Sequence, residues 1–80
     1  MKIPDQLDAR WIATLGDDQL VAADLQLHAD FHELELVEKA RKGGRYVLLQ
    51  SPADVVNAWL RWALVNNETR SRGLVVRHPR

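Results

Sequence analysis

The stretch DDQLVAADLQLHADFHELELVEKARK, residues 17–42, decides the fold, because no Gly or Pro interrupts it between Gly16 and Gly43. Two acidic residues follow Gly16 directly, as is typical of the first turn of a helix, and Gly43 and Gly44 offer a stop. The pattern predicts one uninterrupted helix of about 26 residues, about 39 Å long at 1.5 Å per residue.

Apolar residues of this helix fall into two stripes on nearly opposite sides. At 100° per residue, the first stripe consists of Leu20, Ala23, Leu27, Phe31 and Leu34. The second stripe consists of Val21, Leu25, Ala29, Leu36 and Ala40. One stripe can face the rest of the chain, and the other then needs a separate partner. We therefore expect the second stripe to be an oligomer or partner interface, with a homodimer as the simplest assembly.

Two further helices are expected on either side of this one. Residues 4–15 carry apolar side chains every four residues, begin with Pro4 and end at Gly16. Residues 52–72 follow Ser51, a typical N-cap, and end at Gly73. Apolar side chains cover more than half of this last helix, so we expect it to form the centre of the core.

Two short apolar runs, residues 45–50 and 74–78, are predicted to be strands because residues that interrupt regular secondary structure lie on either side of each run. The expected fold is therefore α+β and mainly helical, a single domain over residues 1–80 with three helices and two short strands. Two strands alone leave open edges, so we expect dimerisation to complete the sheet.

The composition excludes several classes of protein. A chain of 80 residues with 46% hydrophobic residues is one small globular domain, and the absence of cysteine excludes disulfides and thiol nucleophiles. No apolar run approaches the roughly 20 residues that a bilayer crossing requires, and the first residues lack a secretory pattern. We expect a cytoplasmic protein with no membrane partner.

Charge is divided unevenly along the chain although the net charge is zero. Residues 1–38 hold nine acids and two bases, and residues 39–80 hold nine bases and two acids. Either the two halves neutralise each other inside the fold, or each presents a surface that attracts an oppositely charged partner. The cations that would bind nucleic acid or another anion in the second case are Lys39, Arg41, Lys42, Arg45, Arg70, Arg72 and Arg77.

Residues that carry enzyme chemistry are sparse. His28 and His32 lie one helical turn apart and can reach one cation, but no Glu follows the first histidine as the zinc-protease helix requires. Ser51 is expected to cap a helix, and no catalytic triad is indicated. We expect no catalytic residues, no cofactor and no enzyme activity, and we leave open whether the histidine pair binds a metal.

These observations favour a small non-enzymatic regulatory or adaptor protein that acts through protein–protein interaction and self-associates through its long helix. The alternative is a nucleic-acid-binding regulator that uses the basic C-terminal half. The two hypotheses differ in salt dependence, because phosphate contacts make affinity fall steeply with salt.

Overall fold

The computed structural model describes residues 2–78 and is 69% helical. Its elements, in chain order, are α1 (Ala9–Thr14), α2 (Asp17–Arg41), the 3-10 helix η1 (Leu48–Gln50) and α3 (Ala53–Ser71). These described residues contain no strand, so the fold is all-helical and the predicted α+β class is wrong.

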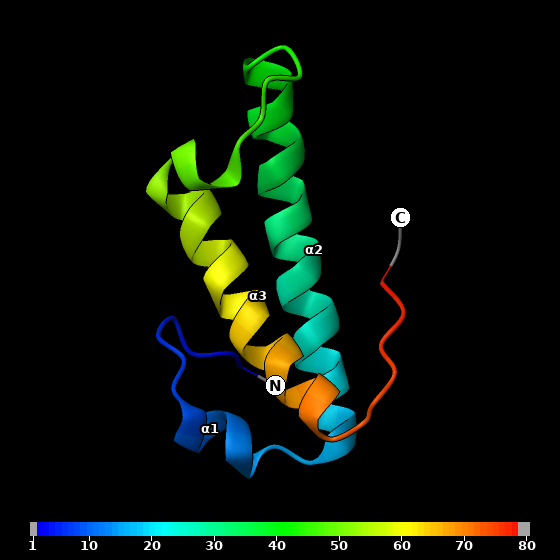
Figure 1. Ribbon diagram of the computed structural model, residues 1–80. Coiled ribbons are helices and arrows are strands. Elements are labelled where there is room, and N and C mark those ends of the chain that lie inside the picture. Colours follow the sequence, from blue (N-terminus) through cyan, green and yellow to red (C-terminus); the bar gives the residue numbers. More distant parts are fainter. Residues whose placement is uncertain (1, 79–80) are drawn as a thin grey trace.

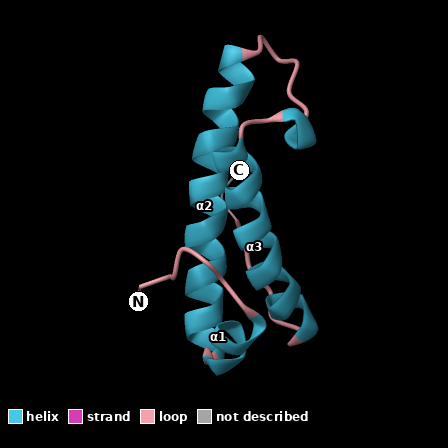
Figure 2. Ribbon diagram, turned by 90° about the vertical axis from the view of Figure 1, so that its left-hand side faces the viewer, coloured by secondary structure: helices cyan, strands magenta, loops and turns pink. Residues whose placement is uncertain are grey.

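Helices α2 and α3 form an antiparallel hairpin and lie side by side in both views (Figure 1, Figure 2). Helix α1 lies at the end of the hairpin where α2 begins and α3 ends (Figure 1). The molecule measures 40 × 25 × 21 Å, and its long axis matches the roughly 38 Å expected of the 25-residue α2. Within residues 2–78, no helix combines the length and the hydropathy that a bilayer crossing requires.

The core lies where α1 meets the hairpin. Its buried members are Ile12, Leu15, Leu20, Ala23, Leu27 and Val65. Phe31 and Val55 are the other buried apolar side chains of the described residues. The first apolar stripe of α2 therefore faces α3, as its spacing predicts. Helix α3 is not the centre of the core: only Val55, Val65 and Thr69 are buried on it, because α3 packs along its length against α2 alone and meets α1 and η1 only near its ends.

The first helix is shorter than predicted, because α1 begins at Ala9 rather than at Pro4. Asp8 is the N-cap: its backbone is extended, and its carboxylate accepts a hydrogen bond from the backbone N–H of Trp11 at 2.8 Å. Upstream, the carbonyl of Pro4 accepts a 2.8 Å hydrogen bond from Arg61 on α3. The first residues are thus tied to the hairpin instead of extending the helix.

Helix α2 is one unbroken rod, and it ends at Arg41, one residue before the predicted end. The backbone then turns through Gly43 and Gly44, whose φ angles of 57° and 89° are left-handed and favour glycine. The side chain of Lys42 donates a hydrogen bond to the carbonyl of Gln50 at 3.3 Å. This contact closes the connection between the end of α2 and the start of α3.

Neither predicted strand forms. Residues 45–50 end in the 3-10 turn η1, and residues 74–78 are extended without a partner strand. The reason is the length of α3, whose 19 residues separate the two segments by about 28 Å. A strand needs a neighbouring backbone for its hydrogen bonds, and the antiparallel hairpin places these segments at opposite ends of α3 (Figure 1). The expectation that a dimer completes a sheet is therefore wrong as well.

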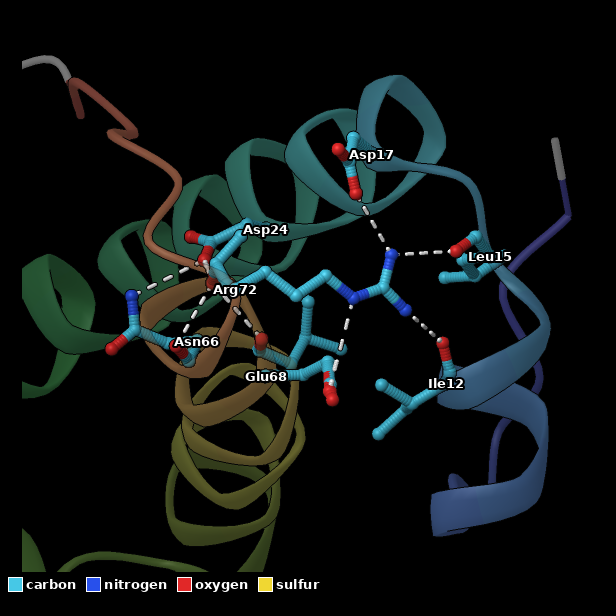
Figure 3. Close-up of polar contacts among 9 residues, drawn as sticks. Ile12, Leu15, Asp17, Asp24, Asn66, Glu68 and Arg72 are labelled. Atoms are coloured by element: carbon cyan, nitrogen blue, oxygen red, sulfur yellow. Dashed lines mark hydrogen bonds and ion pairs between the residues drawn. The ribbon is translucent and has the colours of Figure 1, made fainter.

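One arginine fastens α1 to the hairpin. Arg72, the C-cap of α3, donates hydrogen bonds to the carbonyls of Leu15 at 2.7 Å and Ile12 at 3.4 Å (Figure 3). It also donates to the carboxylate of Asp17, in the first turn of α2, at 3.1 Å. A cation is well placed here because the last carbonyls of a helix carry partial negative charge.

We expect Arg72→Ala to lower the free energy of unfolding by about 2 kcal/mol, because it removes charge-assisted hydrogen bonds that join three helices. Urea unfolding followed by circular dichroism measures the change. Arg10→Ala, on the exposed side of α1, is the matched control and should change stability by less than about 0.5 kcal/mol. Equal effects of the two variants would contradict the assigned role of Arg72.

Candidate functional site

A fully buried carboxylate lies between the two long helices. Asp24 on α2 has no exposed surface, and its two oxygens accept hydrogen bonds from three side chains of α3: Trp62 at 2.9 Å, Asn66 at 3.2 Å and Thr69 at 2.6 Å. Nε2 of His78, from the segment after α3, lies 2.5 Å from the same carboxylate. Figure 3 shows Asp24 and Asn66 facing each other across the helix pair. We call these five residues the Asp24 cluster.

The pKa of Asp24 reflects two opposing influences. Burial is the largest and raises the pKa, because it disfavours the charged carboxylate. The hydrogen bonds from Thr69, His78, Trp62 and Asn66 together outweigh burial, so the pKa lies below its ordinary value. Asp24 is therefore ionised at neutral pH and acts as an acceptor only.

Histidine rings gather beside this carboxylate. The ring of His28 lies 4.1 Å from that of His78 and 5.1 Å from that of Trp62, measured between centroids. Burial, followed by the proximity of His78 and then His32, lowers the pKa of His28, so its ring is neutral at pH 7. Within residues 2–78 no group of three or more His, Cys, Asp or Glu side chains is arranged to hold a metal ion, which leaves the predicted His28 and His32 pair without further ligands.

The carboxylate and the hydroxyl of the Asp24 cluster are buried. The only hydroxyl in it belongs to Thr69, which is 1% exposed and donates its proton to Asp24. A nucleophile must be within reach of a substrate, and this one is not. The cluster therefore has a structural role. Its hydrogen bonds stabilise the buried charge of Asp24 and hold α3 and the C-terminal segment in place against α2.

Sequence reasoning did not identify Asp24 as a buried residue. A signal was present, because Asp24 follows Leu20 by four residues and therefore lies about 40° from it on the helix. That angle places the carboxylate within the buried stripe. Its donors could not be found in the same way, because they lie 38 to 54 residues further along the chain.

The predicted interface stripe on α2 is not uniform. Val21 and Leu25 are half-buried, whereas Ala29, Leu36 and Ala40 are exposed. Leu36 is the only large apolar side chain among the exposed three, with 53% of its surface accessible. The exposed part of the stripe therefore consists of one leucine and two alanines, and alanine methyl groups bury little area.

The seven predicted anion-binding cations do not form one surface. Lys39, Arg41, Lys42 and Arg45 lie where α2 ends, whereas Arg70 and Arg72 lie at the far end of α3. Arg77 is exposed in the extended C-terminal segment.

Several of these cations are already paired. Glu38, which is 3% exposed, forms ion pairs with Arg41 at 3.3 Å and Lys42 at 3.2 Å. Lys39 pairs with Glu35 at 3.5 Å. Acidic residues of the first half of the chain thus neutralise basic residues of the second half within the fold.

Two leucines of α3 are exposed. Leu60 and Leu64 are 45% and 49% exposed and lie one helical turn apart. A shallow hollow of about 480 Å³ lies beside them. We define the α3 outer face as the six residues Trp59, Leu60, Ala63, Leu64, Asn67 and Arg70. They line this hollow together with Trp62 and Asn66 of the Asp24 cluster.

Two smaller hollows, of about 210 Å³ and about 420 Å³, lie toward α1 and toward residues 5–7 and also reach Leu64. The two leucines therefore form a ridge with depressions on either side. A ridge between two depressions is a suitable shape for packing against another helix, because the side-chain ridges of one helix fit into the grooves of the other.

We expect Asp24→Ala to lower the free energy of unfolding by about 3 kcal/mol, because four donors lose their shared acceptor in a buried place. Chemical denaturation measures the change. Asp30→Ala on the same helix is the control, since Asp30 accepts a single side-chain hydrogen bond among residues 2–78, from Gln26 at 2.9 Å near the surface. A loss below about 1 kcal/mol for Asp24→Ala would show that the cluster does not fix the hairpin.

Acidification should destabilise the protein in two steps. His28 has a lowered pKa in the folded state, so the unfolded chain binds its proton first and stability falls as the pH drops below about 6.5. Asp24 also has a lowered pKa, and its contribution is lost only below about pH 3.9, as the pH passes through the folded pKa. His28→Gln should flatten the upper step in a series of denaturation curves from pH 7 to pH 5. An unchanged slope in that variant would contradict the assignment.

Comparisons of the chain with protein-family models, curated proteins and solved structures return no significant match. The function is therefore argued from the geometry of the helices and their exposed surfaces.

Proposed function

We propose that the protein is a small non-enzymatic regulatory or adaptor protein that acts through protein–protein interaction, and that the α3 outer face is its binding surface. The observation that carries the proposal is the exposed ridge of Leu60 and Leu64 with its adjoining hollow. An exposed apolar patch framed by polar residues is typical of a protein interface. Asn67 and Arg70 provide that polar margin here.

The α3 outer face is a better interface than the second stripe of α2 that the sequence predicts. The part of that stripe near the start of α2, Val21 and Leu25, is half-buried within the chain itself. Interfaces depend on a few large anchors that become fully desolvated. The α3 outer face offers two leucines and Trp59 close together, whereas the exposed part of the α2 stripe offers only Leu36.

The closed Asp24 cluster supports a role without catalysis. Its carboxylate is saturated with donors, and the adjacent hydroxyl of Thr69 is buried. The distribution of cations favours a protein partner over nucleic acid, because phosphate binding depends on several unpaired cations along one surface. In this chain Arg41, Lys42 and Arg72 are bound to carboxylates.

A photo-reactive amino acid at position 64 tests the proposal in the cells that produce the protein. We expect irradiation to give a covalent adduct with a protein, because Leu64 lies at the centre of the α3 outer face. The matched control is position 75, since Val75 is 81% exposed but lies outside this face. Adducts of equal yield at both positions, or adducts that nuclease removes, would count against the proposal.

The nucleic-acid alternative is tested separately with the purified protein. Duplex and single-stranded oligonucleotides are titrated at about 50 mM and about 200 mM salt. We expect no binding that weakens steeply with salt, because the cations are divided between two ends of the hairpin. Tight, salt-dependent binding that Arg45→Glu abolishes would favour the nucleic-acid reading instead.

A further inference from the structure

We infer that residues 74–78 form a strap that lies over the buried carboxylate of Asp24 and opens on acidification. His78 holds the strap closed, and uptake of a proton by His28 opens it. The inference goes beyond the proposed function, because it describes a movement within one chain and requires no partner. Opening would expose the rings of His28 and Trp62 to solvent while the helices remain folded.

One face of the strap rests on the helices. Leu74, Val76 and His78 are half-buried, whereas Val75 and Arg77 are exposed. This alternation is the period of two that an extended segment shows when one side of it is covered. The strap runs back from the end of α3 along the side of α2 (Figure 1). It is therefore docked by alternate side chains, although the described residues contain no strand to pair with it.

Only the first residue of the strap is fixed through its backbone. The N–H of Leu74 donates to the carbonyl of Thr69 at 3.0 Å, and the Leu74 side chain packs against the core. Among the described residues, residues 75–78 make no backbone hydrogen bond. Val75 is 81% exposed, so its backbone torsions can change without disturbing a packed side chain. The strap can therefore swing about Val75 at the cost of side-chain contacts alone, as is typical of segments that open locally.

His78 makes the contact that closes the far end of the strap. Its Nε2 lies 2.5 Å from the carboxylate of Asp24, and its ring meets that of Trp62 edge to face, with 5.7 Å between centroids. Without this contact the carboxylate keeps its hydrogen bonds from Trp62, Asn66 and Thr69 of α3. Release of His78 therefore leaves the buried carboxylate with three donors and the helical hairpin intact.

The ring of His28 lies directly against the ring of His78. Their centroids are 4.1 Å apart, and Trp62 of α3 lies 5.1 Å from His28. Two protonated imidazoles at this separation repel each other in a partly buried place. A single proton on His78 pairs with Asp24 and favours the closed strap. The closed strap therefore accommodates one proton on the two rings, whereas the open strap accommodates two.

The titratable groups around His28 act in opposite directions. The strap contributes His78, α3 contributes Trp62, which does not titrate, and α2 contributes His32, Asp24 and Glu35. Burial, followed by His78 and His32, lowers the pKa of His28, whereas the carboxylates of Asp24 and Glu35 raise it. The lowering influences prevail while the strap is closed. Opening reduces the burial and removes His78, so the open chain binds a proton on His28 more readily.

The sign of the response follows from this difference. At about pH 7.5 His28 is neutral whether the strap is closed or open, and the strap is closed. As the pH falls below about 6.5, the ordinary pKa of imidazole, the open chain gains a proton on His28 that the closed chain resists. Asp24 has a lowered pKa, so it remains ionised at about pH 5 and keeps its hydrogen bonds from α3. Acidification to about pH 5 therefore opens the strap before it unfolds the helices.

Thiol labelling at two neighbouring positions measures the opening, because the chain contains no cysteine of its own. Val76→Cys places a thiol on the docked side of the strap, and Val75→Cys places one on the exposed side as the matched control. The ratio of the two rates removes the effect of pH on the thiolate itself. At about pH 7.5 we expect Val76→Cys to react at least about 10-fold more slowly than Val75→Cys, and at about pH 5 we expect the ratio to approach one.

Histidine variants in this background assign the groups. His28→Gln cannot take up the proton and should keep Val76→Cys protected at about pH 5. His32→Gln is the matched control and should retain most of the pH response, because its ring lies 6.1 Å from that of His28 and outside the contact with the strap. His78→Ala removes the contact that closes the strap and should make the ratio close to one at every pH. Circular dichroism over the same range should show that the helices are retained.

The unsubstituted chain provides an independent measurement. The indole N–H of Trp62 donates to Asp24 at 2.9 Å, and the Trp62 ring adjoins the ring of His78. The NMR signal of this N–H should therefore change position between about pH 7.5 and about pH 5. The change should be much smaller in His28→Gln, in which the strap stays closed.

Any of three results would overturn the inference. Equal labelling of the two cysteine variants at about pH 7.5 would show that the strap is not docked. Protection of Val76→Cys that persists at about pH 5, or a pH response that His28→Gln leaves unchanged, would show that a proton on His28 does not open the strap. Loss of the helical signal over the pH range in which labelling rises would assign the change to unfolding of the whole chain.

Discussion

The buried carboxylate of Asp24 is the constraint on which the rest of the structure depends. An ionised group inside a small core must be surrounded by donors, and three of its donors come from successive turns of α3. This requirement fixes both the rotation and the register of α3 against α2. Because Trp62, Asn66 and Thr69 must face inward, the leucines on the opposite side of the helix must face outward. The exposed apolar surface of α3 is thus a consequence of the orientation that Asp24 imposes on this helix.

The two oppositely charged halves of the sequence meet within one hairpin. Antiparallel packing brings Arg72 to Asp17, whereas Glu38 pairs with Lys42 one helical turn away, where the acidic half of the chain gives way to the basic half. Ion pairs at the surface contribute little individually, but they remove the field that a segregated distribution would create. With these cations paired, the proposed interface rests on the exposed leucines of α3 rather than on a charged surface.

Glycine positions and helical periodicity were sufficient to predict where the long helix lies, because both are local properties of the chain. The strands were wrong because a short apolar run such as residues 45–50 has no local feature that distinguishes a strand from a turn packed on a helix end. The shortened α1 depends on the Arg61 contact with Pro4, which joins distant residues. The α3 outer face was misjudged as core for a related reason: periodicity reports which sides of a helix are apolar, not how many neighbours the chain provides. The burial of Asp24 could have been predicted from its angular position on α2, but the residues that donate hydrogen bonds to it could not.

The contacts of the C-terminal residues also determine when the structure can be completed. Most contacts of a helical hairpin are local and form early, whereas Arg72 and His78 reach partners that lie 54 to 60 residues earlier in the chain. On a ribosome, α2 is made well before the side chains that neutralise its internal carboxylate have left the exit tunnel. Asp24 therefore waits for its donors until residues 62–69 of α3 have been made, and the contact with His78 is added last.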